Sequence, residues 1–200
     1  MKRRTAVLRP PRVRVLSSRT AFSGRIIRVS VDRVVLPNGR ASVREVVRHP
    51  GAAAVVPILP DGRVLLVEQY RYAPDATLLE IPAGTLDAGE SPRACAVREL
   101  REETGYSASR WTRLAAFLAA PGTLDETITV FLARGLRAGE AALDADEDGL
   151  ALRPMPLEAA LRAVRSGRIR DGKSIVGLFL AAARGAGSVR TAARERSRDR

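Results

Sequence analysis

Residues 84–106 read GTLDAGESPRACAVRELREETGY and are the most informative stretch of this 200-residue chain. The part from 91 to 105 predicts a helix, because Ser91 is a favourable N-cap and Pro92 suits the first helical turn. Gly105 suits the left-handed conformation that commonly ends a helix. No helix breaker occurs in the central part of this segment. The stretch therefore predicts one well-capped helix.

Glu99, Glu102 and Glu103 are spaced i, i+3 and i+4, so their carboxylates project from one face of this helix. Like charges at this spacing destabilise an isolated helix, and binding of a hard divalent cation by oxygen ligands is the usual reason to gather them. For the helix taken alone, a solvated acidic face is the alternative. Val97 and Leu100 point to another side, where we expect them to pack on a sheet.

The spacing of the whole stretch resembles the signature of the Nudix hydrolases, G-x5-E-x7-R-E-U-x-E-E-x-G-U, in which U is a bulky apolar residue. Its fixed positions are filled by Gly84, Glu90, Arg98, Glu99, Leu100, Glu102, Glu103, Gly105 and Tyr106. A match of this length is far more specific than a lone glycine motif. The resemblance implies an α/β fold, a Nudix α/β/α sandwich with a mixed sheet. It also implies hydrolysis of a nucleoside diphosphate linked to another group.

The same resemblance implies roles for individual residues. Glu99, Glu103 and the backbone carbonyl of Ala83 are the expected ligands of Mg²⁺ or Mn²⁺. Glu102 is the next candidate ligand and an expected catalytic residue. Arg98 is placed to pair with a carboxylate, for which Glu90 is a candidate. The positions expected to be structural are Gly84, Glu90, Arg98, Gly105 and, further along, Pro121.

The sequences beside the signature resemble the ADP-ribose pyrophosphatase branch of the Nudix hydrolases. They are LLEIPAG at 78–84, EQYR at 68–71 and a proline, Pro121, sixteen residues after Gly105. Ala120 stands before that proline where serine is usual. This branch implies a small-molecule substrate, ADP-ribose, and the products AMP and ribose 5-phosphate.

Further positions match residues that contact the substrate in this branch. Arg44 and Arg71 would bind the phosphates, for which guanidinium forks are well suited. Glu126 matches a carboxylate that contacts the terminal ribose, and Phe22 is a candidate surface for stacking adenine. For Arg71 the alternative is a salt bridge at a strand end. His49 has no partner that would make it a catalytic base, and it is expected to be structural.

Hydrolysis also needs a base, which in this branch lies in an acidic loop after the last strand of the sheet. The matching stretch is Asp144-Ala145-Asp146-Glu147-Asp148. Glu147 is the expected base or added metal ligand, with Asp146 second. The stretch departs from the paired glutamates of the branch, so the division of roles stays open. A flexible acidic surface loop is the alternative.

The chain is expected to divide into a disordered basic tail at 1–19, a small N-terminal β unit at 20–50, a Nudix hydrolase domain at 51–185 and a basic tail at 186–200. Turn residues and β-branched residues indicate the β unit. The branch implies that this unit is exchanged between the subunits of a homodimer. Further elements expected are a hairpin within a buried sheet at 52–71, a strand at 127–133, and helices at 157–164 and 174–183.

Composition excludes several kinds of site. The chain has one cysteine, Cys95, and one histidine, so an internal disulfide and a multi-histidine metal site are excluded. Any divalent metal would therefore be held by oxygen. Cys95 is expected to pack within the helix, and a single cysteine suits a reducing, cytoplasmic location. No segment approaches the roughly 18 uncharged apolar residues of a membrane span.

The net charge of +12 is concentrated at the two ends of the chain. Residues 1–19 contain seven Lys or Arg and no acid, and residues 186–200 contain five Arg and two acids. The body between them is nearly neutral, unlike a basic DNA-binding domain. Two alternatives to ADP-ribose hydrolysis stay open. One is hydrolysis of another nucleoside diphosphate sugar, such as GDP-mannose, or of a dinucleotide. The other is a non-enzymatic protein that binds nucleic acid through its tails.

Overall fold

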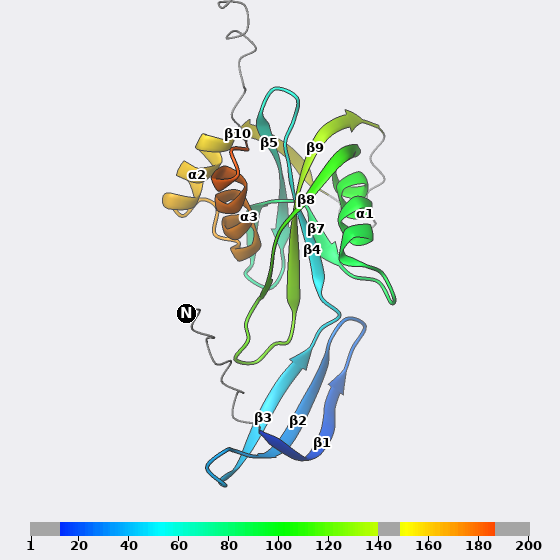
Figure 1. Ribbon diagram of the computed structural model, residues 1–200, viewed down its shortest axis with the longest axis vertical. Coiled ribbons are helices and arrows are strands. Elements are labelled where there is room, and N and C mark those ends of the chain that lie inside the picture. The colour runs from blue at the N-terminus through cyan, green and yellow to red at the C-terminus, as the bar shows by residue number, and fades with distance from the viewer. Residues whose placement is uncertain (1–12, 140–148, 187–200) are drawn as a thin grey trace, which may run out of the picture. The chain divides into compact units, whose positions relative to one another are not determined.

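The computed structural model describes residues 13–139 and 149–186 (Figure 1). Contacts divide the chain into two compact units. The N-terminal unit contains the chain up to residue 49 together with 120–126. The main unit contains residues 50–119 and the chain from 127 onward. Each unit is described by itself.

The N-terminal unit is an antiparallel sheet with β2 in the middle. Its strands are β1 (Arg14–Ser23), β2 (Arg28–Val35) and β3 (Ala41–Arg48). The segment 120–126 joins this unit through β3. The N–H of Val47 donates to the Thr123 carbonyl at 2.8 Å, and the Asp125 N–H donates to the Val47 carbonyl at 3.1 Å. Pairing with β3 therefore holds the segment that carries the expected substrate residue Glu126.

The boundary predicted between the first tail and the β unit is wrong. Strand β1 begins at Arg14, which pairs with Val35, so residues 14–19 belong to the sheet. Every residue of β1 is exposed. The strand therefore lacks the alternation of apolar and polar residues that reveals a half-buried strand in a sequence. Backbone pairing with β2 holds the strand in place, and such pairing cannot be recognised from amino-acid composition.

The main unit contains a four-stranded sheet and a three-stranded sheet. The first has the order β7 (Ala83–Thr85), β4 (Ala52–Pro57), β9 (Thr127–Ala138), β8 (Tyr106–Leu118), and the second has the order β10 (Ala151–Pro156), β5 (Arg63–Arg71), β6 (Ala76–Glu80). Strands β4 and β9 are parallel, whereas the other neighbours are antiparallel. The predicted mixed sheet is confirmed.

The hairpin predicted for residues 52–71 is wrong. Its two strands, β4 and β5, lie in different sheets and share one isolated bridge between Ile58 and Val64. The predicted turn is present, since the Gly62 N–H donates to the Leu59 carbonyl at 2.9 Å. However, every residue of β4 is buried. A strand buried on both faces favours a central position, and β4 takes one between β7 and β9.

Helices cover both sides of the sheets. They are α1 (Pro92–Thr104), α2 (Leu157–Arg165) and α3 (Gly172–Ala183). Helix α1 lies on one side, and α2 and α3 lie on the other (Figure 1). This arrangement is the predicted α/β/α sandwich. None of the helices in the described ranges combines the length and apolarity needed to cross a membrane.

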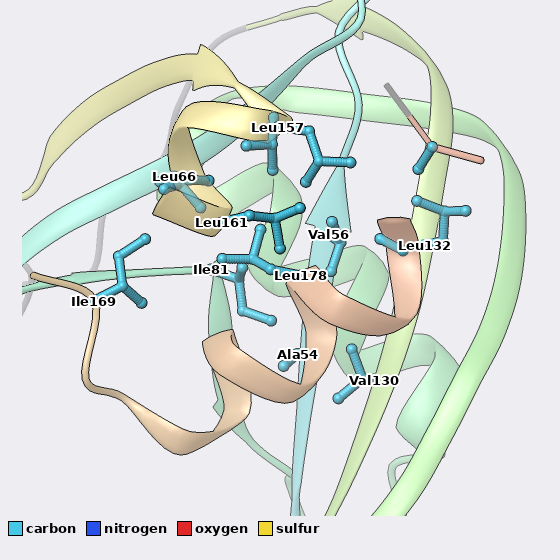
Figure 2. Close-up of a cluster of buried hydrophobic side chains, with 14 of the residues drawn as sticks. Ala54, Val56, Leu66, Ile81, Val130, Leu132, Leu157, Leu161, Ile169 and Leu178 are labelled. Atoms are coloured by element: carbon cyan, nitrogen blue, oxygen red, sulfur yellow. The ribbon is translucent and has the colours of Figure 1, made fainter. Parts of the chain in front are cut away.

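Two cores hold these layers together. The larger lies under α2 and α3 and includes Leu66, Ile81, Val130, Leu161 and Leu178 (Figure 2). Ala186 also belongs to this core, so the main unit extends past the boundary predicted at 185. The smaller core lies under α1 and includes Val55, Cys95, Leu100 and Phe131. Its packing fixes α1 on the sheet, and with it the side chains that α1 carries.

Candidate active site

Helix α1 begins and ends where the sequence predicts. The Ser91 hydroxyl accepts a hydrogen bond from the Ala94 N–H at 3.2 Å. At the other end Gly105 has a φ of 71°, and its N–H donates to the Arg101 carbonyl at 2.8 Å. These caps satisfy backbone groups that helix ends leave unpaired. They also fix the turn on which each carboxylate of α1 lies.

Two of the three carboxylates of α1 face β7 and are almost fully buried. Glu99 is 6% exposed and Glu103 is 3% exposed. The Glu103 Oε2 accepts a hydrogen bond from the Ala83 N–H at 3.2 Å. The Glu99 carboxylate lies against Gly84, where an added Cβ would be 1.7 Å from Glu99 Oε1. The structure therefore brings Ala83, Gly84, Glu99 and Glu103 together, as predicted. Glycine is needed at position 84 because any larger side chain would collide with the carboxylate on α1.

Arg98 joins the carboxylates of α1 to the preceding loop. Its Nε and Nη2 donate to the two oxygens of Glu90 at 3.1 and 2.9 Å, so the predicted pair is present. Its Nη1 donates to Glu99 at 2.7 Å and to Glu102 at 3.0 Å. The hydrogen bond to Glu90, with those to the other two glutamates, raises the pKa of Arg98 well above its usual value. This permanent charge offsets the repulsion among the glutamates.

The donor set suits a hard divalent cation. Glu99, Glu103 and the nearby Ala83 carbonyl offer oxygens alone, which is the chemistry that Mg²⁺ and Mn²⁺ prefer. The Glu99 carboxylate packs closely against the backbone of Gly84, which limits its movement. Within residues 13–139 and 149–186, however, no group of three or more acidic, histidine or cysteine side chains is arranged to enclose an ion. A backbone oxygen or further ligands would have to complete the coordination.

Cys95 packs in the core as predicted. It is buried, and its Sγ lies 3.5 Å from the Gly84 carbonyl oxygen and 3.7 Å from that of Thr85. Burial, with a smaller contribution from Glu99, raises the pKa of the thiol to about 12. The side chain is therefore a neutral thiol at physiological pH and packs as a small apolar group. Val97, in contrast, is 45% exposed, so the prediction that it packs on the sheet is wrong.

Arg71 makes the strand-end salt bridge that was the alternative to a substrate role. Its Nε and Nη2 donate to Glu80 at 3.0 and 2.8 Å. Lys173, from the first turn of α3, binds the same carboxylate at 2.5 Å and also pairs with Asp171 at 3.1 Å. Hydrogen bonding to Glu80 raises the pKa of Arg71, and Glu103 adds to this effect. A guanidinium held near the candidate metal ligand Glu103 is also suited to bind a phosphate.

Sequence reasoning missed Glu80 and Lys173 as site residues. Glu80 is 1% exposed. Burial opposes its charge, but the hydrogen bonds from Arg71 and Lys173 outweigh burial and keep the pKa of Glu80 below its usual value. Lys173 is 93 positions from Glu80 along the chain. No local pattern connects residues so far apart, although Glu80 lies inside the LLEIPAG stretch.

We expect Glu80→Gln to lower the free energy of unfolding by about 3 kcal/mol at pH 7, because two cations would lose their shared buried carboxylate. The native pKa of Glu80 is depressed. Its contribution is therefore present above the unfolded pKa of about 4.3 and is lost as the pH falls through the native pKa. Urea unfolding across this range measures both effects. The difference in unfolding free energy between the variant and the wild type should be largest at pH 7 and should become smaller below pH ~4.

The control for this change is Glu158→Gln, which alters an exposed carboxylate in the first turn of α2. It should leave the unfolding free energy within about 0.5 kcal/mol of wild type. Equal stability of Glu80→Gln and wild type at pH 7 would contradict the structural role of the network.

The other predicted substrate residues lie in the N-terminal unit. Arg44 is exposed on β3, and its Nη1 donates to the Ser42 hydroxyl at 2.7 Å and the Val43 carbonyl at 2.9 Å. Phe22 is 54% exposed on β1, and a Cβ on Gly24 would lie 2.8 Å from its ring. These contacts hold both side chains at the surface of that unit. Both residues belong to the N-terminal unit, whereas α1 belongs to the main unit.

The segment 120–126 adds two more predicted residues to the N-terminal unit. Pro121 lies in a turn in which the Ala120 carbonyl accepts from the N–H groups of the third and fourth residues after it, at 3.1 and 2.9 Å. Glu126 lies 3.5 Å from Nδ1 of His49. The N–H of His49 also donates to the Asp125 carboxylate at 2.9 Å. His49 therefore pairs with the segment 120–126, and its structural role stays a prediction. Its partner lies 77 positions away and leaves no local signal.

The predicted base falls outside this geometry. Glu147 and Asp146 lie outside the residues that the structure describes. The described site therefore contains the candidate metal ligands and one candidate substrate arginine, but not the candidate base.

Comparisons with known proteins cover most of the chain. The model of the NUDIX domain matches residues 47–175, and that of the nucleoside diphosphate sugar hydrolase N-terminal domain matches residues 13–47. An ADP-ribose pyrophosphatase of Bacillus subtilis is 43% identical over 162 residues, which are 80% of this chain and 88% of that protein. A methanol dehydrogenase activator of Bacillus methanolicus is also 43% identical, over 82% of this chain and 89% of its own.

A solved structure, described as an ADP compounds hydrolase, shares the fold. It superposes with a TM-score of 0.78 at 24% identity and covers 89% of this chain and 96% of its own. At this identity the likeness supports the architecture alone. The start of the N-terminal match at residue 13 agrees with a β unit that includes all of β1.

Proposed function

Because this chain belongs to the Nudix family, we propose that it hydrolyses the diphosphate bond of ADP-ribose, giving AMP and ribose 5-phosphate. One observation carries the proposal. Glu99 and Glu103 of the Nudix signature are buried against the backbone of Ala83 and Gly84, in a chain 43% identical to an ADP-ribose pyrophosphatase. Two proteins of equal identity have different names, so identity alone does not choose the substrate. The LLEIPAG and EQYR sequences favour ADP-ribose.

The side chains of α1 would hold the metal ion. Glu99, Glu103 and the Ala83 carbonyl are the proposed ligands of Mg²⁺ or Mn²⁺, with Glu102 beside them. When bound, such an ion neutralises diphosphate charge and lowers the pKa of water. Arg98 keeps Glu99 and Glu102 in place through its Nη1.

Hydrolysis forms a bond between water oxygen and phosphorus and breaks the bond from that phosphorus to the bridging oxygen. Glu147 would accept the proton of the attacking water, with Asp146 as the second candidate. Arg71, fixed by its fork to Glu80, and Arg44 would bind the phosphate oxygens. Their positive charge would keep the acidic site from repelling an anionic substrate. Glu126 would bind the terminal ribose, and Phe22 would stack on adenine.

We propose that the chain forms a homodimer through its N-terminal unit. Every residue of β1 is exposed, including Val15, Leu16 and Phe22. A small sheet that leaves large apolar side chains in water is only marginally stable alone, which favours a partner surface. We further propose a cytoplasmic location, since the one cysteine is a buried free thiol. The basic tails fall largely outside the described residues, and their binding to nucleic acid stays an alternative function.

We expect the purified chain to release AMP from ADP-ribose in the presence of Mg²⁺, and to lose this activity when EDTA removes the metal. Parallel assays with GDP-mannose and a dinucleotide should give values of kcat/KM at least about tenfold lower. A preference for GDP-mannose would refute ADP-ribose as the substrate, but it would support metal-dependent hydrolysis of a diphosphate bond. Absence of metal-dependent turnover on every substrate would contradict the proposal and favour the nucleic-acid alternative.

A further inference from the structure

Helix α1 carries a second feature on the side that faces β8. Val97 is 45% exposed there, although Leu100 three residues later is fully buried. Val97 lines a hollow of about 560 Å³ between α1 and β8. Arg93 and Arg101 line it from α1, and Trp111 lines it from β8. None of the glutamates of the signature belongs to this lining.

The aromatic wall of the hollow is held in place. The ring of Trp111 packs edge-on against Phe131, with centroids 6.3 Å apart. Its Nε1 donates to the Ala108 carbonyl at 3.0 Å. The guanidinium of Arg93 lies over the ring, 4.5 Å from its centroid. Because these contacts fix the ring, Trp111 gives the hollow an apolar wall that does not have to be ordered when a ligand binds.

The polar lining of the hollow is cationic. Arg93, Arg98 and Arg101 all contribute to it, and no acidic side chain does. Arg98 forms ion pairs with Glu90, Glu99 and Glu102. Among the described residues, no ion pair engages Arg93 or Arg101. Two guanidinium groups beside an apolar wall, without a neutralising carboxylate, favour an anion.

We propose that this hollow binds a small organic anion that carries an aromatic ring. The ring would lie against Trp111 and Val97, and the anionic group would pair with Arg101 and Arg93. The volume falls in the range of about 300–1,000 Å³ that is usual for small-molecule sites, and so does the combination of apolar walls with a few convergent polar groups. The lining shares Arg98 with the proposed diphosphate site but includes none of the proposed metal ligands or substrate-binding residues, so the existence of this second site does not depend on the proposed activity.

The chain offers an internal reporter for this site, since Trp111 is its single tryptophan. The test is a titration of the full-length protein with anilinonaphthalene sulfonate, an aromatic anion, while the emission of Trp111 is recorded. We expect saturable quenching, with energy transfer to the probe. Phenylnaphthylamine, which has the same rings without the sulfonate, should bind at least about tenfold more weakly, because it cannot pair with arginine.

Charge reversal then locates the anionic group. Arg101 and Arg165 both lie in the last turn of a helix, α1 and α2 respectively. Arg101→Glu and Arg165→Glu therefore change net charge and helix-end electrostatics alike. Arg101→Glu should raise the Kd of the sulfonate at least about tenfold, whereas Arg165→Glu should change it less than about twofold. Circular dichroism would verify that both variants fold. The proposed site would be refuted if the two variants bound the sulfonate with equal Kd values, or if phenylnaphthylamine bound as tightly as the sulfonate.

Discussion

Replacing Glu103 by glutamine should lower kcat for ADP-ribose by about a thousandfold or more, which corresponds to ~4 kcal/mol of activation free energy. Glu103 is 3% exposed and accepts a hydrogen bond from the Ala83 N–H. Glutamine has nearly the same size and can keep that hydrogen bond through its amide oxygen. It removes the negative charge on which metal binding depends. Steady-state release of AMP with saturating Mg²⁺ measures the effect.

Glu158→Gln is the matched control, because it makes the same chemical change on the surface of α2. It should keep kcat within about twofold of wild type. Thermal unfolding of both variants would show whether the loss of activity is separate from loss of fold. An intact rate in Glu103→Gln would contradict the metal role.

Gly84→Ala should lower kcat/KM by about a hundredfold, which corresponds to ~2.7 kcal/mol. An added Cβ would lie 1.7 Å from Oε1 and 2.1 Å from Cδ of Glu99, so this carboxylate would have to move. Glu99 is 6% exposed and is held by Arg98, so it has little room to move without breaking that pair. We expect a larger effect on activity than on stability, since the far end of one side chain moves. Parallel assays of AMP release and urea unfolding compare the two.

Gly172→Ala is the control for the added methyl group. No heavy atom lies within 4 Å of a Cβ at this position, which is the first residue of α3. The substitution should leave kcat/KM unchanged and stabilise the protein by up to about 1 kcal/mol. Full activity of Gly84→Ala would mean that the position of Glu99 does not matter for catalysis.

The sequence predicted α1 well because the information that defines it is local. Its caps, Ser91 and Gly105, lie within one turn of the ends that they close. The contact of Arg98 with Glu90 was also expected, since eight positions separate the two residues. Periodicity likewise placed α2 and α3 to within a few residues. Local chemistry was therefore sufficient for the helix on which the candidate site is built.

Elements that depend on distant partners could not be predicted in the same way. Strand β8, at 106–118, was not expected, because its sequence is rich in Ser, Ala and Arg rather than β-branched residues. It forms by pairing along almost its whole length with β9. The partner of β4 was misassigned for the same reason, since β9 lies more than 70 positions away. Hydrogen bonding between distant strands therefore determines that β8 is a strand and which strand β4 pairs with.

The same limit applies to the candidate site. The cation that shares Glu80 with Arg71 comes from α3, and the partner of His49 comes from the segment 120–126. Val97 looked like a core residue because apolar residues on helices usually pack inward. It is instead half-exposed and lines the same hollow as Trp111. These residues could be assigned only when the fold placed their partners.

We propose that the buried carboxylates of α1 hold a hard divalent ion next to the substrate diphosphate. Anomalous diffraction at the manganese edge, from crystals grown with Mn²⁺, tests it most directly. We expect an anomalous peak within coordination distance of Glu99, Glu103 and the Ala83 carbonyl oxygen, and no such peak in crystals of Glu103→Gln. Ordered manganese elsewhere, with no peak beside these carboxylates, would contradict it.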